Sequence, residues 1–345
     1  MKITIHDVAK AANVSIATVS RVINNNYPVS KKTRIRVEKV IEELSYKPNE
    51  IARSLILKTT RNIGVIVPGL TNIFFPTIVE GINNELRENG FTLSLYTSDN
   101  DPEEEKKLLE VIMSRNMDGV IIIDPSVKNL SNGFIGSVAK KIPTILISGK
   151  VDKYGYNFIS YDEEVGTLEA FQYLYDLGHR KILFIRGSAS LSYDLKENSY
   201  HRFIKKNNLN YNQVLSVGKG NNMDVVENTS RVFDEFLNVD KEFTAVFACN
   251  DLMAVGVINS CNSIGIKIPK DLSIIGFDNT LLSNISNPKL TSVDLNIKKV
   301  AKTAAREIIS LSKNNELSLD NVTFDSRLFL RDSCAVPKMA SIIKI

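Results

Sequence analysis

The sequence predicts an all-α N-terminal segment followed by an α/β region that contains two parallel sheets. Three observations support this fold class. Apolar residues recur every three or four positions up to residue 46, as they do along helices. From residue 62 onward, short runs rich in Val and Ile alternate with helical patterns, which is typical of parallel sheets with crossover helices. The length of 345 residues exceeds the roughly 250 to 300 residues at which single cores stop growing, so we expect more than one domain.

The chain begins with two short predicted helices joined by a tight turn. Ile5, Val8 and Ala12 recur at helical spacing, and an Asn-Val-Ser turn then interrupts the pattern. Ser15 can cap a second helix over 16–24, because a serine hydroxyl accepts a hydrogen bond from the free N–H groups of a first turn. Two short helices joined by three residues form a helix-turn-helix.

A third predicted helix completes a small core. Ser30 can cap it, and Val37, Val40 and Leu44 lie on one stripe. A proline then ends the helix, and residues 48–61 contain one more short helical pattern, too short to be stable alone.

The charge of the chain is distributed unevenly. Residues 1–62 contain 12 Lys or Arg against 5 Asp or Glu, whereas the remaining residues contain 31 against 34. A basic segment of this kind is expected where one part of a protein approaches phosphates.

Four stretches resemble the lactose/galactose repressor (LacI/GalR) family of regulators. They read Thr-Ile-His-Asp-Val-Ala-Lys at 4–10, Thr-Val-Ser-Arg-Val-Ile-Asn at 18–24, Tyr-Lys-Pro-Asn at 46–49 and Ala-Arg-Ser-Leu at 52–55. The resemblance implies a sequence-specific regulator that binds a palindromic double-stranded DNA operator as a homodimer, in which the second helix enters the major groove and a hinge helix enters the minor groove.

The resemblance also implies which residues contact DNA. The base-reading positions are Ile16, Ala17 and Arg21, and Leu55 is the wedge that kinks the duplex from the minor groove. The other implied DNA-contacting positions are Thr4, His6, Ser15, Thr18, Asn24 and Ala52. Two alternatives stay open: Arg21 can contact a phosphate or face solvent, and Leu55 can pack against the third helix. The reader helix is more similar to those of the catabolite control proteins of the family than to that of the lactose repressor, which predicts one dominant G·C pair in each half-site.

The remainder resembles the two-lobed type I periplasmic-binding-protein fold. Strands are expected at 63–67, 92–96, 119–123, 144–147, 181–185, 245–248 and 272–276. The implied parts are a helix-turn-helix headpiece at 1–47, a hinge helix and linker at 48–61, and an effector-binding and dimerisation domain at 62–345. Its lobes are expected at about 62–161 with 291–322 and at about 162–290 with 323–338, so that the chain crosses near Tyr161, Leu290 and Val322.

A small-molecule effector is expected in the cleft between the lobes, since ligands of open α/β sheets bind at the carboxyl ends of the strands. The candidate wall residues are Phe74, Phe75, Ser148, Ser190, Ser192, Tyr193, Asp194, Lys196, Asn250, Asp251 and Asp278. Core packing is the alternative for the two phenylalanines, and helix capping is the alternative for Asp278. Relatives usually have an arginine where this chain has Lys196 and often an aspartate where it has Ser148, which indicates an unusual effector or none.

Other functions find less support in the sequence. Three cysteines at Cys249, Cys261 and Cys334 have neither disulfide nor metal-ligand spacing, so we expect no metal and no cofactor. An enzyme would need a catalytic triad or a phosphate-binding glycine fingerprint, and neither is evident. A sugar receptor of the same fold would need an export signal, which the first residues do not resemble, so a cytoplasmic protein without a membrane partner is expected. A sugar or sugar phosphate is the expected effector. A protein corepressor, activation instead of repression, and a tetramer instead of a dimer stay open.

Overall fold

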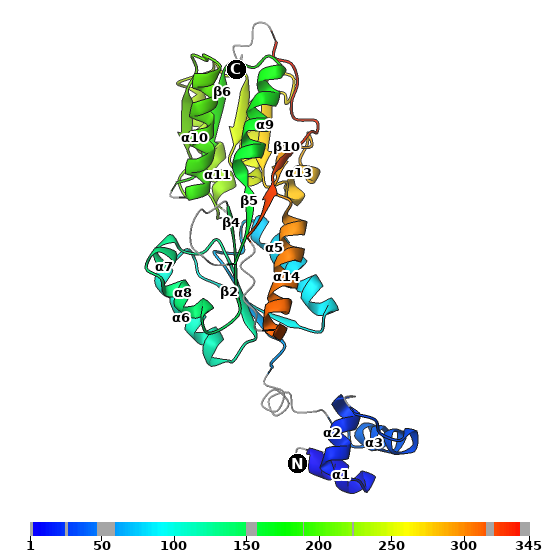
Figure 1. The fold of residues 1–345 in the computed structure, drawn as a ribbon. Helices are drawn as coiled ribbons and strands as arrows, with labels where there is room; N and C mark the ends of the chain where they lie inside the picture. The colour runs from blue at the N-terminus through cyan, green and yellow to red at the C-terminus, as the bar shows by residue number, and fades with distance from the viewer. Residues whose placement is uncertain are drawn as a thin grey trace. The chain divides into compact units, whose positions relative to one another are not determined.

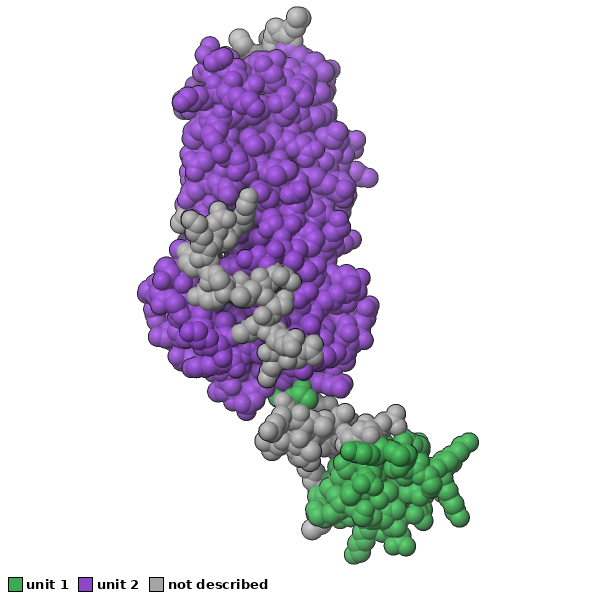
Figure 2. All heavy atoms as spheres, viewed as in Figure 1, with its two compact units in different colours: residues 1–60 green, residues 61–345 purple. Residues whose placement is uncertain are grey.

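The computed structural model describes residues 3–24, 27–46, 59–149, 157–188, 190–222, 224–314 and 321–338 (Figure 1). The chain forms two compact units, residues 1–60 and residues 61–345 (Figure 2). Residues 47–58, which include most of the expected hinge helix with Ala52 and Leu55, lie outside the described residues.

The first unit contains the three predicted helices. They are α1 (Ile5–Ala12), α2 (Ile16–Asn24) and α3 (Lys31–Glu43). The predicted caps are present, because Ser15 Oγ accepts a hydrogen bond from the backbone N–H of Thr18 at 3.2 Å and Ser30 Oγ accepts one from Thr33 at 3.2 Å. The apolar stripes of the three helices meet in one core formed by Val8, Ala9, Ala12, Val19, Val22, Val37 and Val40.

The second unit contains two six-stranded sheets, each the centre of one lobe (Figure 1). The first lobe has the order β11-β5-β4-β3-β1-β2, and the second has the order β12-β10-β9-β8-β6-β7. The first sheet consists of β1 (Asn62–Val67), β2 (Thr92–Thr97), β3 (Gly119–Ile123), β4 (Thr144–Gly149), β5 (Phe158–Asp162) and β11 (Val322–Asp325). The second consists of β6 (Ile182–Arg186), β7 (Gln213–Ser216), β8 (Ala245–Ala248), β9 (Ser273–Phe277), β10 (Thr291–Asp294) and β12 (Arg327–Phe329). Neighbouring strands run parallel, except that β12 runs antiparallel to β10.

Helices cover both sheets and bury their Val- and Ile-rich strands. The first lobe carries α5 (Phe74–Glu88), α6 (Pro102–Ser114), α7 (Val127–Ser131), α8 (Phe134–Ala139) and α14 (Ile297–Asn314). The second carries α9 (Glu163–Asp176), α10 (Leu191–Lys206), α11 (Val225–Leu237), α12 (Asp251–Ile264) and α13 (Leu281–Ile285). This confirms the predicted fold class. Within the described residues, no helix is both long and apolar enough to cross a membrane.

All seven predicted strands are present, and five further strands were not predicted. The five are β5, β7, β10, β11 and β12, which have three to five residues each. They lack the continuous apolar run of a strand buried on both faces; β10, for example, reads Thr-Ser-Val-Asp.

The missed strands change where the chain crosses between the lobes. It crosses between Asp162 and Glu163, as expected, and next between β10 and α14 at residues 295–296, later than the expected Leu290. The third crossing falls at Ser326, after β11, instead of near Val322. Residues 291–294 therefore belong to the second lobe and residues 323–325 to the first.

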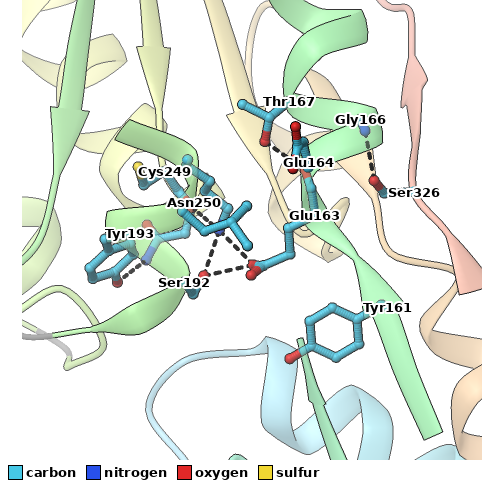
Figure 3. Close-up of polar contacts among 12 residues, drawn as sticks. Tyr161, Glu163, Glu164, Gly166, Thr167, Ser192, Tyr193, Cys249, Asn250 and Ser326 are labelled. Atoms are coloured by element: carbon cyan, nitrogen blue, oxygen red, sulfur yellow. Dashed lines mark hydrogen bonds and ion pairs between the residues drawn. The ribbon is translucent and has the colours of Figure 1, made fainter. Parts of the chain in front are cut away.

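The first and third crossings meet at Gly166 on α9. Its backbone N–H donates a hydrogen bond of 2.8 Å to Ser326 Oγ (Figure 3). Ser326 in turn donates to the carbonyl oxygen of Asp162. A Cβ atom at position 166 would collide with Val293 of β10 as well as with Ser326. The first and third crossings are thus hydrogen-bonded at one point against which β10 packs, and only a residue without a side chain fits there.

Candidate nucleic-acid interface and ligand cleft

The helix α2 presents one buried and one exposed face. Val19 and Val22 are buried in the core of the first unit, whereas Ile16, Ala17 and Arg21 are exposed on the other side. Ile16 is 41% exposed, so its side chain can be reached by a partner. These three side chains are the predicted base-reading positions, and the fold of the helix leaves them free.

Arg21 has no ion-pair partner among the described residues. Its guanidinium lies 5.4 Å from the centre of the Tyr27 ring, a cation–π contact that leaves the N–H groups available for a base or a phosphate. Of the predicted backbone-contacting residues, Thr4, His6 and Ser15 are exposed and Thr18 is half-buried. The side chain of Asn24 lies outside the described residues, as do Ala52 and Leu55.

A cavity of about 610 Å³ lies between the two lobes of the second unit. Its walls come from the carboxyl ends of strands in both sheets, as expected for open α/β folds. The strand-end residues in its lining are Pro68, Ser98, Asp124, Ser148, Glu163, Ser188 and Lys219. We call this space the outer cavity.

A smaller space of about 40 Å³, which we call the inner chamber, shares walls with the outer cavity. It is lined by Asn72, Phe74, Phe75, Asp124, Tyr161, Glu163, Ser190, Ser192, Tyr193, Lys196, Asn221, Cys249, Asn250, Asp278 and Leu295. Nine of the eleven predicted effector residues line one or both spaces: Phe74, Phe75, Ser148, Ser190, Ser192, Tyr193, Lys196, Asn250 and Asp278.

The other two predicted effector residues, Asp194 and Asp251, line neither space. Asp194 accepts a hydrogen bond of 2.6 Å from the Arg186 guanidinium. Asp251 is turned into the protein, where its carboxylate accepts hydrogen bonds from the backbone N–H and hydroxyl of Thr280 at 2.7 and 2.8 Å and from Ser292 at 2.6 Å. Asp251 therefore ties the loop after β9 to β10.

Lys196 and Glu163 form a buried ion pair at the edge of the inner chamber. The ammonium lies 2.9 Å from the Glu163 carboxylate, and the two side chains are 2% and 4% exposed. Ser192 links them, because it donates to Glu163 at 2.6 Å and accepts from Lys196 at 2.9 Å; Figure 3 shows Ser192 and Glu163 pointing toward each other. Although burial opposes the charged form, the adjacent Glu163 carboxylate raises the pKa of Lys196, so the ammonium stays charged.

Two further carboxylates face the inner chamber. Asp278 is 7% exposed and follows β9 with a φ of 95°, a backbone conformation that side-chain-bearing residues rarely adopt and that is retained mainly at functional sites. Burial raises the pKa of Asp278 to about 8, against the opposing effect of Lys196. Asp124 follows β3, and its side chain is open to solvent in the cleft. Desolvation by the cleft walls and, next, the nearby Glu163 carboxylate raise the pKa of Asp124 to about 7.

Aromatic rings form one wall of the inner chamber. Phe74 contacts Phe75 and Tyr161 edge to face, with centroid distances of 5.2 and 5.9 Å. Both phenylalanines are buried in the hydrophobic core and also line the chamber. Each therefore packs in the core and forms part of the cleft wall, so the two roles that the sequence left open are not exclusive. The hydroxyl of Tyr161 donates a hydrogen bond to Asp124 at 3.3 Å.

Hydrogen bonds connect the two lobes at the side of the cleft. Thr71 of the first lobe donates to the backbone carbonyl of Asn221 in the second at 3.0 Å, and Asn72 donates to the side-chain carbonyl of Asn221, also at 3.0 Å. Tyr193 donates to the same oxygen at 2.9 Å. Asn250 donates to the Gly220 carbonyl at 2.8 Å, and its own side-chain oxygen caps α12.

Several of the cavity residues were missed from the sequence. Asp124 directly follows a predicted strand, so the rule that selected Ser148 could have found it. Tyr161, Glu163 and Asn221 follow or end β5 and β7, which were not recognised as strands.

Comparisons with known proteins agree with this architecture. Residues 4–49 match the model of the bacterial regulatory proteins of the lacI family, and residues 171–334 match that of a periplasmic binding protein-like domain. The catabolite control protein A of Priestia megaterium is 32% identical, over 96% of this chain and 99% of that protein. The chain belongs to the LacI family of bacterial regulatory proteins.

Membership of the LacI family excludes the enzyme hypothesis and shows that the chain is a DNA-binding transcription regulator with a ligand-binding domain. The transcriptional regulator MalR of Clostridium butyricum, also of this kind, is 32% identical over 96% of this chain and 98% of its own length. Among solved structures, the lac repressor dimer bound to operator and the anti-inducer ONPF has a TM-score of 0.85 and 26% identity, and covers 97% of this chain and 100% of its own.

Proposed function

We propose that the protein represses transcription as a homodimer bound to a palindromic operator, under control of a small polyhydroxylated effector in the cleft. The exposed face of α2 carries this proposal. A single helix of this length covers one half-site only, so a palindrome requires two chains related by a two-fold axis. We place much of the dimer interface on the first lobe, on α5 and α6. Binding to DNA places the protein in the cytoplasm.

The reading face supports a specific kind of operator. Ile16 offers only apolar contact, for instance to a thymine methyl, and Ala17 is too short to hydrogen-bond a base edge. Arg21 is then the one of the three that can form two hydrogen bonds with a guanine. This combination fits an operator with one dominant G·C pair in each half-site and a central CpG step under Leu55. Because a catabolite control protein is among the relatives, carbon metabolism is the favoured field of regulation.

The cleft supports a sugar more than a sugar phosphate. Serine, asparagine and carboxylate side chains in its walls can hydrogen-bond hydroxyl groups, and Phe75 can cover the apolar face of a ring. The described lining of the outer cavity has five carboxylates against one ammonium, that of Lys219, and the buried cation Lys196 is already paired with Glu163. An effector that bridges Asp124 of the first lobe and Asp278 of the second would favour one arrangement of the lobes over others.

Selection from a random duplex library tests the proposal directly. The full-length protein should enrich a palindrome with a strong G at one symmetric pair of positions, and its affinity for that palindrome should fall as salt is added. Enrichment of a motif without such a pair would overturn the proposal that Arg21 recognises a guanine. No enrichment of any motif would overturn the proposed function as a whole.

A further inference from the structure

The inner chamber is unusual in its charge. Three carboxylates line it, those of Asp124, Glu163 and Asp278, against the single ammonium of Lys196. None of the residues that the structure describes around the inner chamber or the outer cavity is an arginine. When its carboxylates are ionised, a chamber of this composition repels anions and attracts cations.

Lys196 compensates only one of the three carboxylates. Its ammonium contacts Glu163 at 2.9 Å, Ser192 at 2.9 Å and the Cys249 carbonyl at 3.4 Å, which accounts for its three N–H donors. Lys196 and Ser192 both contact the Oε1 atom of Glu163. Asp124 and Asp278 therefore have no paired cation among the described residues. Their raised pKa values, about 7 and about 8, leave Asp278 mostly protonated at pH 7 until a cation bound in the cleft favours its charged form.

Of these two carboxylates, Asp278 has the greater need for a hydrogen-bond donor. Its side chain is more than nine-tenths buried, and no described residue donates a hydrogen bond to its carboxylate, although a buried carboxylate normally needs such donors. Its oxygens are not among the buried atoms closed off from all partners, so they open onto the chamber. A hydrogen-bond donor for this carboxylate comes from the cleft, either from water or from a ligand that displaces it.

The size of the chamber limits what that donor can be. A volume of about 40 Å³ holds one small group, since a water molecule occupies roughly 30 Å³ of liquid. The aromatic rings of Phe74, Tyr161 and Tyr193 line the same space, and aromatic rings also favour cations. A sugar-sized ring fits only in the adjoining outer cavity of about 610 Å³.

We propose that the effector is an amino polyol, such as an amino sugar, whose ring occupies the outer cavity and whose protonated primary amine enters the inner chamber beside Asp278 and Asp124. This inference rests on the proposed function, because it specifies the effector of the same cleft. The amine supplies the hydrogen-bond donors that Asp278 lacks and balances the excess of carboxylates. Hydroxyl groups of the ring meet Ser148 and Asn221 in the outer cavity.

Calorimetric titration of the full-length protein with matched sugars tests the inference. D-Glucosamine, D-galactosamine and D-mannosamine are each compared with the parent hexose, the N-acetyl derivative and the phosphorylated hexose, at about pH 7 and constant sodium concentration. Within each set the amine, the parent hexose and the N-acetyl derivative differ only at C2, whereas the phosphorylated hexose adds negative charge at another hydroxyl of the same sugar. We expect at least one amine to bind about tenfold or more tightly than its uncharged counterparts, and no phosphorylated sugar to bind.

Substitutions at the carboxylates test where the amine binds. D278N keeps the shape of the side chain and removes the carboxyl group that ionises beside a bound amine, so the preference for the amine over the parent hexose should fall to within about threefold. D332N, which makes the same change at an exposed position outside both spaces, should keep the preference. Residue 332 does not have a left-handed backbone, so this control should fold. If D278N unfolds, D124N takes its place.

Each outcome decides the inference. Tighter binding of an amine that is lost in D278N or D124N supports it. Equal or tighter binding of a parent hexose or phosphorylated sugar, or no binding by any of the three amines, overturns it. The proposed function survives these last results if the protein still selects a palindromic operator, and fails separately if it does not.

Discussion

The ammonium of Lys196 on α10 lies 2.9 Å from the carboxylate of Glu163, the first residue of α9, and neither side chain is more than 4% exposed. The pair lies directly after the first crossing between the lobes. It therefore fixes the second-lobe wall of the cleft at the place where the chain enters that lobe.

Breaking this pair from one side should destabilise the protein strongly. Lys196→Met leaves a buried carboxylate without its cation and should lower the free energy of unfolding by about 3 to 5 kcal/mol in urea titrations. The double variant with Glu163→Gln should lose less, since both charges are then gone. As a surface control, Arg231→Ala removes an exposed pair with Glu235 and should cost at most about 0.5 kcal/mol. Equal losses in the single and double variants would contradict an ion-pair role.

The free energy of unfolding should depend on the charge of Asp278. Its pKa is about 8 when folded against an ordinary value of 3.8, so its contribution to stability is complete below about pH 4 and is lost as pH rises to about 8. The groups that act on it are Lys196, Asp251, Glu163 and Asp124. D278N should make the decline between about pH 5 and about pH 8 shallower by more than about 1 kcal/mol. Identical pH profiles would show that Asp278 is solvated like a surface carboxylate.

Arg21→Ala should weaken operator binding through one base pair. We expect a cost of about 1 to 3 kcal/mol on the selected operator and loss of discrimination at the single G·C pair. Fluorescence anisotropy on operators that vary only at that pair measures both effects. An equal loss of affinity on all duplexes would show that Arg21 contacts a phosphate and not a base.

Leu55→Ala should separate specific from non-specific binding. The wedge matters only where the duplex is kinked, so affinity for the operator should fall by about tenfold or more while affinity for random DNA stays nearly unchanged. Similar losses on both duplexes would make Leu55 an ordinary packing residue.

The protein should sediment as a dimer at about micromolar concentration without DNA. Ultracentrifugation of the full-length chain checks this. A monomer that still binds a complete palindrome with one chain per operator would contradict the proposed assembly.

The sequence predicts best what depends on local patterns. Strands such as 119–123, which reads Gly-Val-Ile-Ile-Ile, are continuous apolar runs because helices cover both of their faces. Residues 291–294 form a strand as well, but this depends on the neighbours β9 and β12, which local residues do not reveal.

The residues of the cavity show the same limit of prediction from local sequence. Ser148 was found because it lies at the end of a recognisable strand, whereas Glu163 was missed because β5 was not recognised. Asp251 also follows a strand, but its side chain turns toward Thr280 and Ser292. The direction of a side chain at a strand end depends on tertiary partners, so strand-end position alone cannot separate Asp251 from Asp278.

The junction at Gly166 has a mechanical consequence. Because the first and third crossings are hydrogen-bonded there and β10 packs against the same residue, a rotation of one lobe relative to the other would have its axis near Gly166. The inner chamber lies near that axis, next to Glu163, where a rotation displaces atoms least. The displacement grows with distance from the axis and is larger at the opposite end of the first lobe, where β1 begins at Asn62 and the chain continues into the DNA-reading unit. A change of shape too small to disturb the packing around an effector is therefore magnified at the point where the second unit connects to the first.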